Sequence, residues 1–284
     1  MNFDRLLQRI TTCHAADMAA FRPWFVGEHV AGWVHQERAA DVASIAGFVR
    51  GSERWTLAGA DFAERTRAMA VVVDGLVRAG RLRAPLGETY PVFAAGRREP
   101  LLAIDRCAVP WFGVHAHGVH LNGYVRTAHG MQVWVARRAR GKRTFPGHLD
   151  NLVAGGQSIG LSSRRTLVKE CHEEAGMPAA LAERAVAVGE LHYTLQLERD
   201  LKVDTLTLFD LELPSDFVPR PVDGEVESFE LWTAAQLLAS LAVDDPWKPN
   251  CALVALHFLL RHHAFDGLLA SAECARLWDA MNPA

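Results

Sequence analysis

The sequence predicts an α+β protein in which a small N-terminal α+β domain precedes a larger domain, whose mixed sheet carries helices on its faces. Two observations lead to this prediction. Helix and strand patterns alternate along the chain, and the second half has the order strand, strand, helix, strands, helix. The 284 residues are also more than one average domain needs and are enough for two.

The first hundred residues predict two helices and several strands. Phe3–Met18 has helical spacing, and Asp61–Ala79 is an apolar-faced helix that should end at Gly80. The extended segments expected here are Trp24–Val34 with a turn at Gly27-Glu28, Ser44–Leu57 with a turn at Gly51-Ser52, and Arg81–Phe93. Turn residues and charges gather over Gly96–Asp105, so we place a domain boundary between residues 104 and 105.

The second domain, residues 105–284, should begin with strands and end with helices. The expected strands are Val114–Thr127, Met131–Arg137, Val186–Leu195 and Val203–Leu213. A loop over Ala139–Leu149 and a Gly-rich turn precede one clear helix, Ser162–Ala175. A second loop follows Leu213, marked by Pro214, Pro219, Pro221 and Gly224. The chain is expected to be helical from Thr233 onward, with Pro246 and Pro249 separating two helices.

Composition excludes several classes of function. A formal charge of −3 lacks the basic surplus of a nucleic-acid-binding protein. The longest apolar runs stop at about ten residues, half of what a membrane span needs. The N-terminus carries charges where a secretory signal would be apolar. Five scattered cysteines without a CxxC pair favour reduced thiols rather than structural zinc, so we expect a cytoplasmic protein.

The strongest chemical feature is an acidic helix after the pair Gly155-Gly156. At about 100° per residue, Glu170, Glu173 and Glu174 lie within one third of the helix circumference. Three like charges on adjacent turns repel one another and weaken an isolated helix. A hard divalent cation would make the cluster tolerable, because Mg²⁺ prefers oxygen ligands and keeps waters for a substrate or nucleophile. The pattern therefore predicts a magnesium site.

The segment from Gly155 to Met177 resembles the Nudix hydrolase signature. Glu170, Glu173 and Glu174 match its metal-binding positions, whereas Leu161 stands where the pattern has Glu and Lys169 where it has Arg. The resemblance implies an α/β/α sandwich and hydrolysis of a small-molecule diphosphate with Mg²⁺, for which Mn²⁺ could substitute. The two replaced positions leave a second hypothesis open, a Nudix fold that binds a ligand without hydrolysing it.

Motifs outside the signature resemble one Nudix subfamily with an additional N-terminal α/β module. They are Gly87–Val92, Trp134–Arg138, Gly141–Gly147, Leu149–Gly156, Asp210–Pro214, Asp223–Phe229 and Lys248–Val254. That subfamily includes enzymes acting on thiamin diphosphate or its damaged analogues. The resemblance therefore makes such a compound the first expected substrate. A nucleoside diphosphate derivative such as ADP-ribose is the alternative.

The remaining site residues are predicted from their position near the signature. Glu225 or Glu227 is expected to add a metal-binding carboxylate, and one of these or Glu174 is the candidate general base. The expected substrate-binding residues are Arg137, Arg138, Lys142, Gly155 and Gly156, with Arg143 as a further cation. Trp134 and Tyr193 are either core residues or stacking partners for a heteroaromatic base. A homodimer is a possible assembly.

His115, His117 and His120 form an HxHxxH pattern that a strand would divide between two faces, His120 lying opposite the other two. This separation argues against a shared metal ion. Cys171 falls on the apolar side of the acidic helix, so a buried thiol is expected there rather than a nucleophile.

Overall fold

The N-terminal part of the chain forms a small α+β unit. The structure, a computed structural model, describes residues 2–44, 46–50, 54–128 and 130–281. The elements up to residue 108 are α1 (Phe3–Cys13), η1 (Met18–Ala20), β1 (Phe21–Val26), β2 (His29–His35), η2 (Gln36–Arg38), α2 (Ala39–Ser44), β3 (Phe48–Arg50), β4 (Trp55–Leu57), α3 (Phe62–Arg78), β5 (Thr89–Val92), β6 (Leu102–Asp105) and η3 (Arg106–Ala108). A four-stranded sheet has the order β2-β1-β4-β3, and β5 pairs with β6.

The rest of the chain builds one larger mixed sheet. Its elements are β7 (His115–Thr127), β8 (Gly130–Arg138), β9 (Leu149–Asp150), β10 (Val153–Gly156), α4 (Ser163–Ala175), α5 (Ala179–Ala182), β11 (Val186–Leu197), β12 (Asp200–Glu212), β13 (Val226–Thr233), α6 (Ala234–Leu241), α7 (Pro249–Arg261) and α8 (Ser271–Met281). The main strand order is β11-β12-β7-β8-β13, with β10 paired to β7 and β9 to β8. β7 and β12 run parallel, whereas the other pairs are antiparallel.

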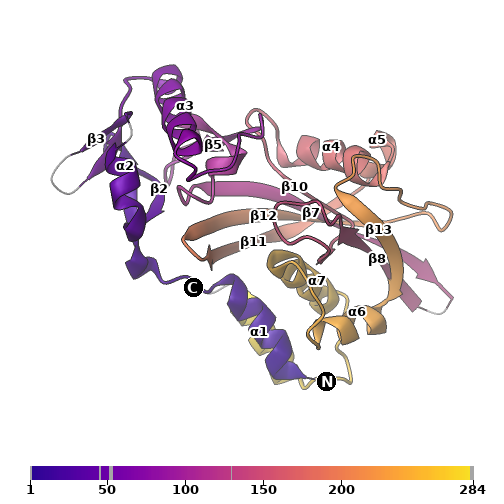
Figure 1. The fold of residues 1–284 in the computed structure, drawn as a ribbon. Helices are drawn as coiled ribbons and strands as arrows, with labels where there is room; N and C mark the ends of the chain where they lie inside the picture. Colours follow the sequence, from indigo (N-terminus) through magenta and orange to yellow (C-terminus); the bar gives the residue numbers. More distant parts are fainter. Residues whose placement is uncertain (1, 45, 51–53, 129, 282–284) are drawn as a thin grey trace.

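Helices cover both faces of this sheet. α4 and α5 lie on one face, and α7 lies on the other with α6 (Figure 1). Val119 and Leu121 of β7 share a buried core with Leu167 of α4. On the opposite face, Leu206 and Leu208 of β12 belong to the core that contains α7. The arrangement is the predicted mixed sheet between two helical layers.

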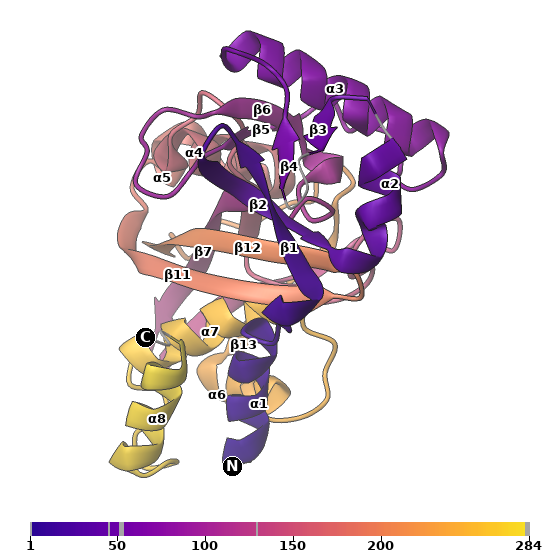
Figure 2. The same cartoon turned by 90° about the vertical axis from the view of Figure 1, so that its left-hand side faces the viewer.

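The first helix packs against the C-terminal helices rather than against the N-terminal sheets. Figure 2 shows α1 beside α7 and α8, below the large sheet. Leu6 and Ile10 are fully buried in the same core as Phe258 of α7 and Leu277 of α8. A separate core joins α3 to the strands β1 to β6. The predicted division after residue 104 stays a prediction.

The main predicted elements are confirmed, with local corrections. The predicted helix Phe3–Met18 ends at Cys13, because Asp17 caps the short turn that follows by accepting a hydrogen bond from the Ala19 N–H. The predicted Gly-rich turn is the strand β10, and the segment that follows the Pro-rich loop is the strand β13. The C-terminal segment has a third helix, α8, among the described residues. The predicted turn at Gly51-Ser52 lies outside the described residues.

No helix within the described ranges has both the length and the apolar character that a membrane span requires.

Candidate active site

The acidic helix α4 is fixed at both ends and along one side. The Ser162 hydroxyl accepts a hydrogen bond from the Arg165 N–H at its N-terminus. Gly176, with φ of 63°, ends the helix in the left-handed conformation that suits glycine. Leu167 and Cys171 are fully buried against the sheet, which confirms the predicted buried thiol. This anchoring determines where the neighbouring glutamates project.

The three glutamates of α4 lie in different environments. Glu174 is buried, and its carboxylate accepts a hydrogen bond of 3.0 Å from the Ala154 N–H of β10. Glu170 is 12% exposed, and Glu173 is 43% exposed. The Lys169 ammonium contacts both of these carboxylates, at 3.1 Å from Glu170 and 2.5 Å from Glu173. One cation therefore contacts both Glu170 and Glu173, while the donor to Glu174 among the described residues is a backbone N–H.

Burial is the main reason why two of these acids resist ionisation. It raises the pKa of Glu174 well above the ordinary value, and the neighbouring acids Asp150, Glu170 and Glu225 add to the effect. It also raises the pKa of Glu170, which the ammonium of Lys169 only partly counteracts. The site thus carries a deficit of positive charge.

The two glycines of β10 allow close packing around these acids. A Cβ at Gly155 would lie 2.2 Å from Cγ of Glu170 and 2.3 Å from its carboxyl carbon. A Cβ at Gly156 would lie 1.4 Å from the hydroxyl oxygen of Tyr90, a residue of β5. Glycine at both positions therefore lets Glu170 and Tyr90 approach the strand closely. Their predicted part in substrate binding stays a prediction.

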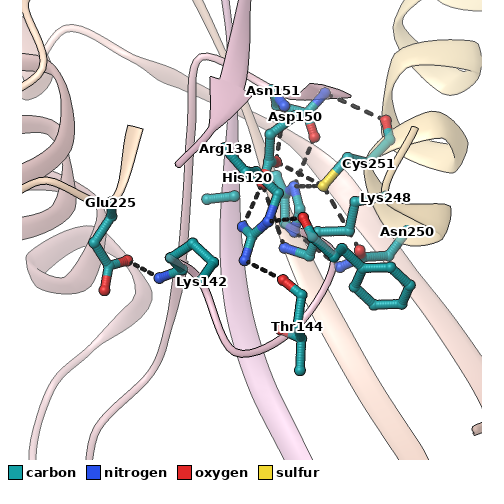
Figure 3. Close-up of polar contacts among 12 residues, drawn as sticks. His120, Arg138, Lys142, Thr144, Asp150, Asn151, Glu225, Lys248, Asn250 and Cys251 are labelled. Atoms are coloured by element: carbon teal, nitrogen blue, oxygen red, sulfur yellow. Dashed lines mark hydrogen bonds and ion pairs between the residues drawn. The ribbon is translucent and has the colours of Figure 1, made fainter. Parts of the chain in front are cut away.

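Of the two further predicted carboxylates, Glu225 is the one close to the acidic helix. Its charge contributes to the raised pKa of Glu174. Burial acts to raise the pKa of Glu225 itself, but the ion pair with Lys142 and the charges of Arg106 and Arg138 lower it overall. Glu227 instead lies exposed on β13, where its nearest ionic partner is Arg140 at 3.7 Å. The predicted cation Lys142 is thus paired with Glu225 (Figure 3).

A buried polar cluster lies beside Lys142 and Glu225 (Figure 3), and its residues come from β8, β9 and the N-terminus of α7. Arg138 binds Asp150 at 2.8 Å and donates hydrogen bonds to the carbonyl oxygens of Thr144 and Phe145. Lys248 also lies 3.6 Å from Asp150. Burial acts to raise the pKa of Asp150, but these two cations lower it to about 2. Arg138, predicted to bind substrate, is therefore occupied in holding the loop that carries Lys142.

Two places in this region could hold a metal ion. His120, Asp150 and Cys251 offer three ligand atoms within 4.8 Å of one another, the compact group found among the described residues. Arg138 and Lys248 already neutralise Asp150 there, and burial raises the pKa of the Cys251 thiol well above the ordinary value, which keeps it protonated. A further cation would meet repulsion at that place.

The acids of α4 fit a hard divalent cation better than this cluster does. They supply only oxygen donors, the set that Mg²⁺ prefers, and they lack sufficient positive charge. Glu170 and Glu173 are drawn toward Lys169, and Glu174 toward the Ala154 N–H, so the carboxylates are held apart by these contacts.

The other predicted residues have varied surroundings. Arg137 donates a hydrogen bond to the carbonyl of Gly147, and Arg143 donates to the carbonyl of Ala84. Trp134 and Tyr193 are buried in the two cores on either side of the sheet, which favours the core alternative over base stacking.

The three histidines of the HxHxxH pattern divide as predicted. The rings of His115 and His117 lie 4.8 Å apart, whereas His120 is buried on the opposite side, against Asn151.

Sequence reasoning missed three residues from the N-terminal unit that lie at this site. Tyr90 contacts Gly156, Glu88 accepts a hydrogen bond of 2.6 Å from Ser158 Oγ, and Arg106 forms an ion pair with Glu88. Glu88 and Tyr90 fall in the Gly87–Val92 motif, which was the available signal, although the motif alone assigns them no role.

Comparisons with known proteins identify relatives for both parts of the chain. A family model described as the NUDIX domain matches residues 117–251, and one described as a domain of unknown function, DUF4743, matches residues 5–116. Two Arabidopsis thaliana proteins, Nudix hydrolase 20 and Nudix hydrolase 24, both described as chloroplastic, are each 37% identical to this chain. Each match covers 90% of this chain and 72% of the plant protein. The crystal structure of DR0079 from Deinococcus radiodurans covers 60% of this chain and 98% of its own, with 22% identity and a TM-score of 0.44.

Proposed function

Since the chain belongs to the Nudix hydrolase family, we propose that it hydrolyses the diphosphate bond of a small organic diphosphate in a magnesium-dependent reaction and releases a monophosphate. The observation that carries this proposal is the group of acids around β10 and α4, with Glu174 buried and Glu170 nearly so. Buried carboxylates that are short of positive charge are costly to ionise, and a bound divalent cation would offset that cost.

Each residue has a specific part in this proposal. Glu170, Glu173 and Glu174 would hold Mg²⁺, with Mn²⁺ as a substitute, and Glu225 would complete the set. A divalent cation supplies charge neutralisation for the diphosphate and lowers the pKa of a bound water. Glu174, or a carboxylate of the loop before β13 such as Glu225, is the candidate general base. Lys142 holds Glu225 in position.

Thiamin diphosphate or an oxidised analogue is the first substrate that we propose. The motifs Gly87–Val92, Leu149–Gly156 and Lys248–Val254 support this choice by their resemblance to enzymes of that kind. ADP-ribose, a nucleoside diphosphate derivative, is the alternative. Both have a diphosphate joined to an organic group, so the same acids would serve either one.

The test is phosphate or monophosphate release from thiamin diphosphate, its oxidised analogues and ADP-ribose, with and without MgCl₂. Glu174→Gln should lower kcat by roughly 100-fold or more, the usual contribution of a catalytic acid or base. Glu183→Gln, the same change at an exposed glutamate, is the matched control and should retain full activity. Equal turnover by Glu174→Gln would remove Glu174 from the mechanism.

A second candidate function is ligand binding without hydrolysis, which Leu161 and Lys169 favour by departing from the signature. Lys169 nevertheless supplies a cation where the signature has Arg, and it contacts both Glu170 and Glu173. The same panel separates the two functions. Tight binding of a diphosphate with no product from any compound would support the binding module and overturn the hydrolase.

A further inference from the structure

The N-terminal unit is in direct contact with the loop that leads into the acidic helix. Figure 1 shows β5 beside this loop and the end of β10. The Ile159 N–H donates to the carbonyl of Thr89 at 2.9 Å, and Ser158 Oγ donates to Glu88 at 2.6 Å. The Tyr90 hydroxyl fills the space that a side chain at Gly156 would need. This unit therefore forms one wall of the site.

Arg106 is the cation that this wall presents. Its guanidinium donates to Glu88 at 2.7 Å, and its backbone N–H donates to the Glu88 carbonyl at 2.8 Å. Its Cζ lies 6.0 Å from the centre of the Tyr90 ring. Among the described residues, Glu88 is the hydrogen-bond partner of its side chain, and 41% of that side chain stays exposed. Donors of the guanidinium thus remain available.

The charge of Arg106 reaches the acids on two other elements. Burial raises the pKa of Glu225, Lys142 lowers it, and Arg106 lowers it further by a smaller amount. Burial also raises the pKa of Glu170, and the charge of Arg106 acts against this rise. Arg106 is therefore close enough to the acidic helix and to the loop before β13 for its charge to act on both. A substrate between these elements would meet this guanidinium.

Three of the alternative cations are less free to bind a substrate. Arg138 donates to Asp150 and to two carbonyl oxygens, and it is largely buried. Lys142 is paired with Glu225, and Lys169 with two acids of α4. Arg106 combines exposure, a fixed anchor and a planar set of donors, which suits contact with two phosphate oxygens at once.

We propose that Arg106 binds phosphate oxygens of the diphosphate substrate from the side of the N-terminal unit, and that Glu88 positions it through their ion pair and its contact with Ser158. Arg106 is then a substrate-binding residue, and Glu88 is a positioning residue. The inference rests on the proposed diphosphate substrate but not on its hydrolysis. It assigns the N-terminal unit a direct part in the active site.

The test measures binding of methylenediphosphonate, a diphosphate analogue that is not hydrolysed, to the full chain by calorimetry in MgCl₂. Arg106→Gln should weaken its affinity by about 10- to 100-fold, the cost of losing a hydrogen bond between charged groups. Arg106→Lys, which keeps the charge but not the planar donors, should recover part of that loss. Arg126→Gln, which breaks an exposed ion pair with Glu212, is the control and should bind normally.

Glu88→Gln tests the positioning role. It should weaken binding by a smaller factor, and the double variant with Arg106→Gln should bind no worse than Arg106→Gln alone. Additive losses would show that Glu88 acts independently of Arg106. If Arg106→Gln does not fold, as judged by thermal unfolding, Arg106→Lys and Glu88→Gln decide the question by the same measurement.

The outcomes separate this inference from the proposed reaction. Normal binding by Arg106→Gln, or no binding by the unchanged protein, overturns the role of Arg106. Reduced binding by Arg106→Gln in a chain that hydrolyses no diphosphate supports Arg106 and overturns the reaction. An effect limited to the thermal unfolding temperature would identify a structural ion pair.

Discussion

At the scale of single residues, the three glutamates of α4 differ in how deeply their side chains are buried. Glu173 is 43% exposed and paired with Lys169. Glu174 is buried on the same helix, one position further along the chain, and its only hydrogen-bond donor among the described residues is the Ala154 N–H. A buried acid with one neutral donor costs folding free energy when it ionises. A bound divalent cation would offset that cost.

This contrast predicts a difference in stabilisation by metal. MgCl₂ at millimolar concentration should raise the thermal unfolding temperature of the unchanged protein, since a ligand that binds only the folded state stabilises it. Glu174→Gln removes a carboxylate ligand and should abolish most of this rise, whereas Glu183→Gln should retain it. Differential scanning calorimetry with and without MgCl₂ measures both. Equal shifts in all three proteins would place the metal elsewhere.

At the scale of elements, Arg138 and Asp150 connect β8, β9, the loop over residues 139–148 and the start of α7. Asp150 receives Arg138 and Lys248, while Arg138 also donates to the carbonyl oxygens of Thr144 and Phe145. This pair therefore ties the loop and the start of α7 to the paired strands β8 and β9 (Figure 3). The loop in turn places Lys142 against Glu225.

Breaking this buried pair should be strongly destabilising. Arg138→Met removes the Arg138 donors from the Thr144 and Phe145 carbonyls and leaves Lys248 as the cation beside Asp150. It should lower the free energy of unfolding by about 3–5 kcal/mol. Arg140→Met, two residues further and 88% exposed, should change it by less than about 1 kcal/mol. Urea unfolding at pH 7.5 compares the two. Similar values for both variants would contradict a structural role for Arg138.

The same cluster predicts how stability depends on pH. Burial lowers the pKa of His120 from 6.5 to about 4. Between these two pH values the imidazole is therefore neutral in the folded state and protonated in the unfolded state. The unfolded state then binds more protons between these two pKa values, and stability must fall as the pH falls through this window. From pH 7 to 5 the contribution of His120 is roughly 2 kcal/mol.

Urea unfolding across that pH range, with His120→Asn as the comparison, measures this contribution. The variant should lose less stability on acidification than the unchanged protein does. Asp150 does not contribute between pH 7 and 5. Its pKa is lowered from 3.8 to about 2 in the folded state, so the stability that it contributes is lost only at more acidic pH. Parallel pH profiles for the two proteins would exclude His120 as the source.

At the scale of the whole molecule, periodicity predicted the elements whose burial is regular along the chain. α3 and α4 have apolar residues at helical spacing, and β7, β8 and β12 are long apolar strands, so their sequences identify them directly. β10 was missed because a Gly-Gly pair usually marks a turn, whereas here it allows Glu170 and Tyr90 to pack against a strand.

The parts of the site that depend on tertiary contacts could not be read from local patterns. Arg106 and Glu88 precede the acidic helix by more than fifty residues, and nothing in their own neighbourhood indicates that they meet it. The pairing of Arg138 with Asp150 has the same origin, since a charged residue near a glycine-rich segment is equally compatible with an exposed position. Spacing along the chain therefore indicated the acids of one helix and the nearby cations Lys142 and Lys169, but not Arg106 and Glu88.

The placement of α1 leads to a prediction about cooperativity. Ile10 is fully buried against the C-terminal helices, and Arg9 donates to the carbonyl oxygens of Leu241 and Val243 at the end of α6. Ile10→Ala should therefore cost about 2–5 kcal/mol and loosen α7, although the two lie more than two hundred residues apart in the sequence. Native-state hydrogen exchange should show faster exchange of amides in α7 than in α3, because α3 belongs to a separate core.

Val71→Ala, on α3 and 49% exposed, is the matched control and should leave exchange in both helices nearly unchanged. If Ile10→Ala accelerated exchange in α3 and left α7 protected, α1 would belong energetically to the N-terminal unit despite its position. If it accelerated α7 first, the first and last segments of the chain would form one cooperative layer beneath the sheet. Since α7 also carries Cys251 and begins beside Lys248 and Asp150, that layer would then support the loop of Lys142 and, through it, Glu225 at the site.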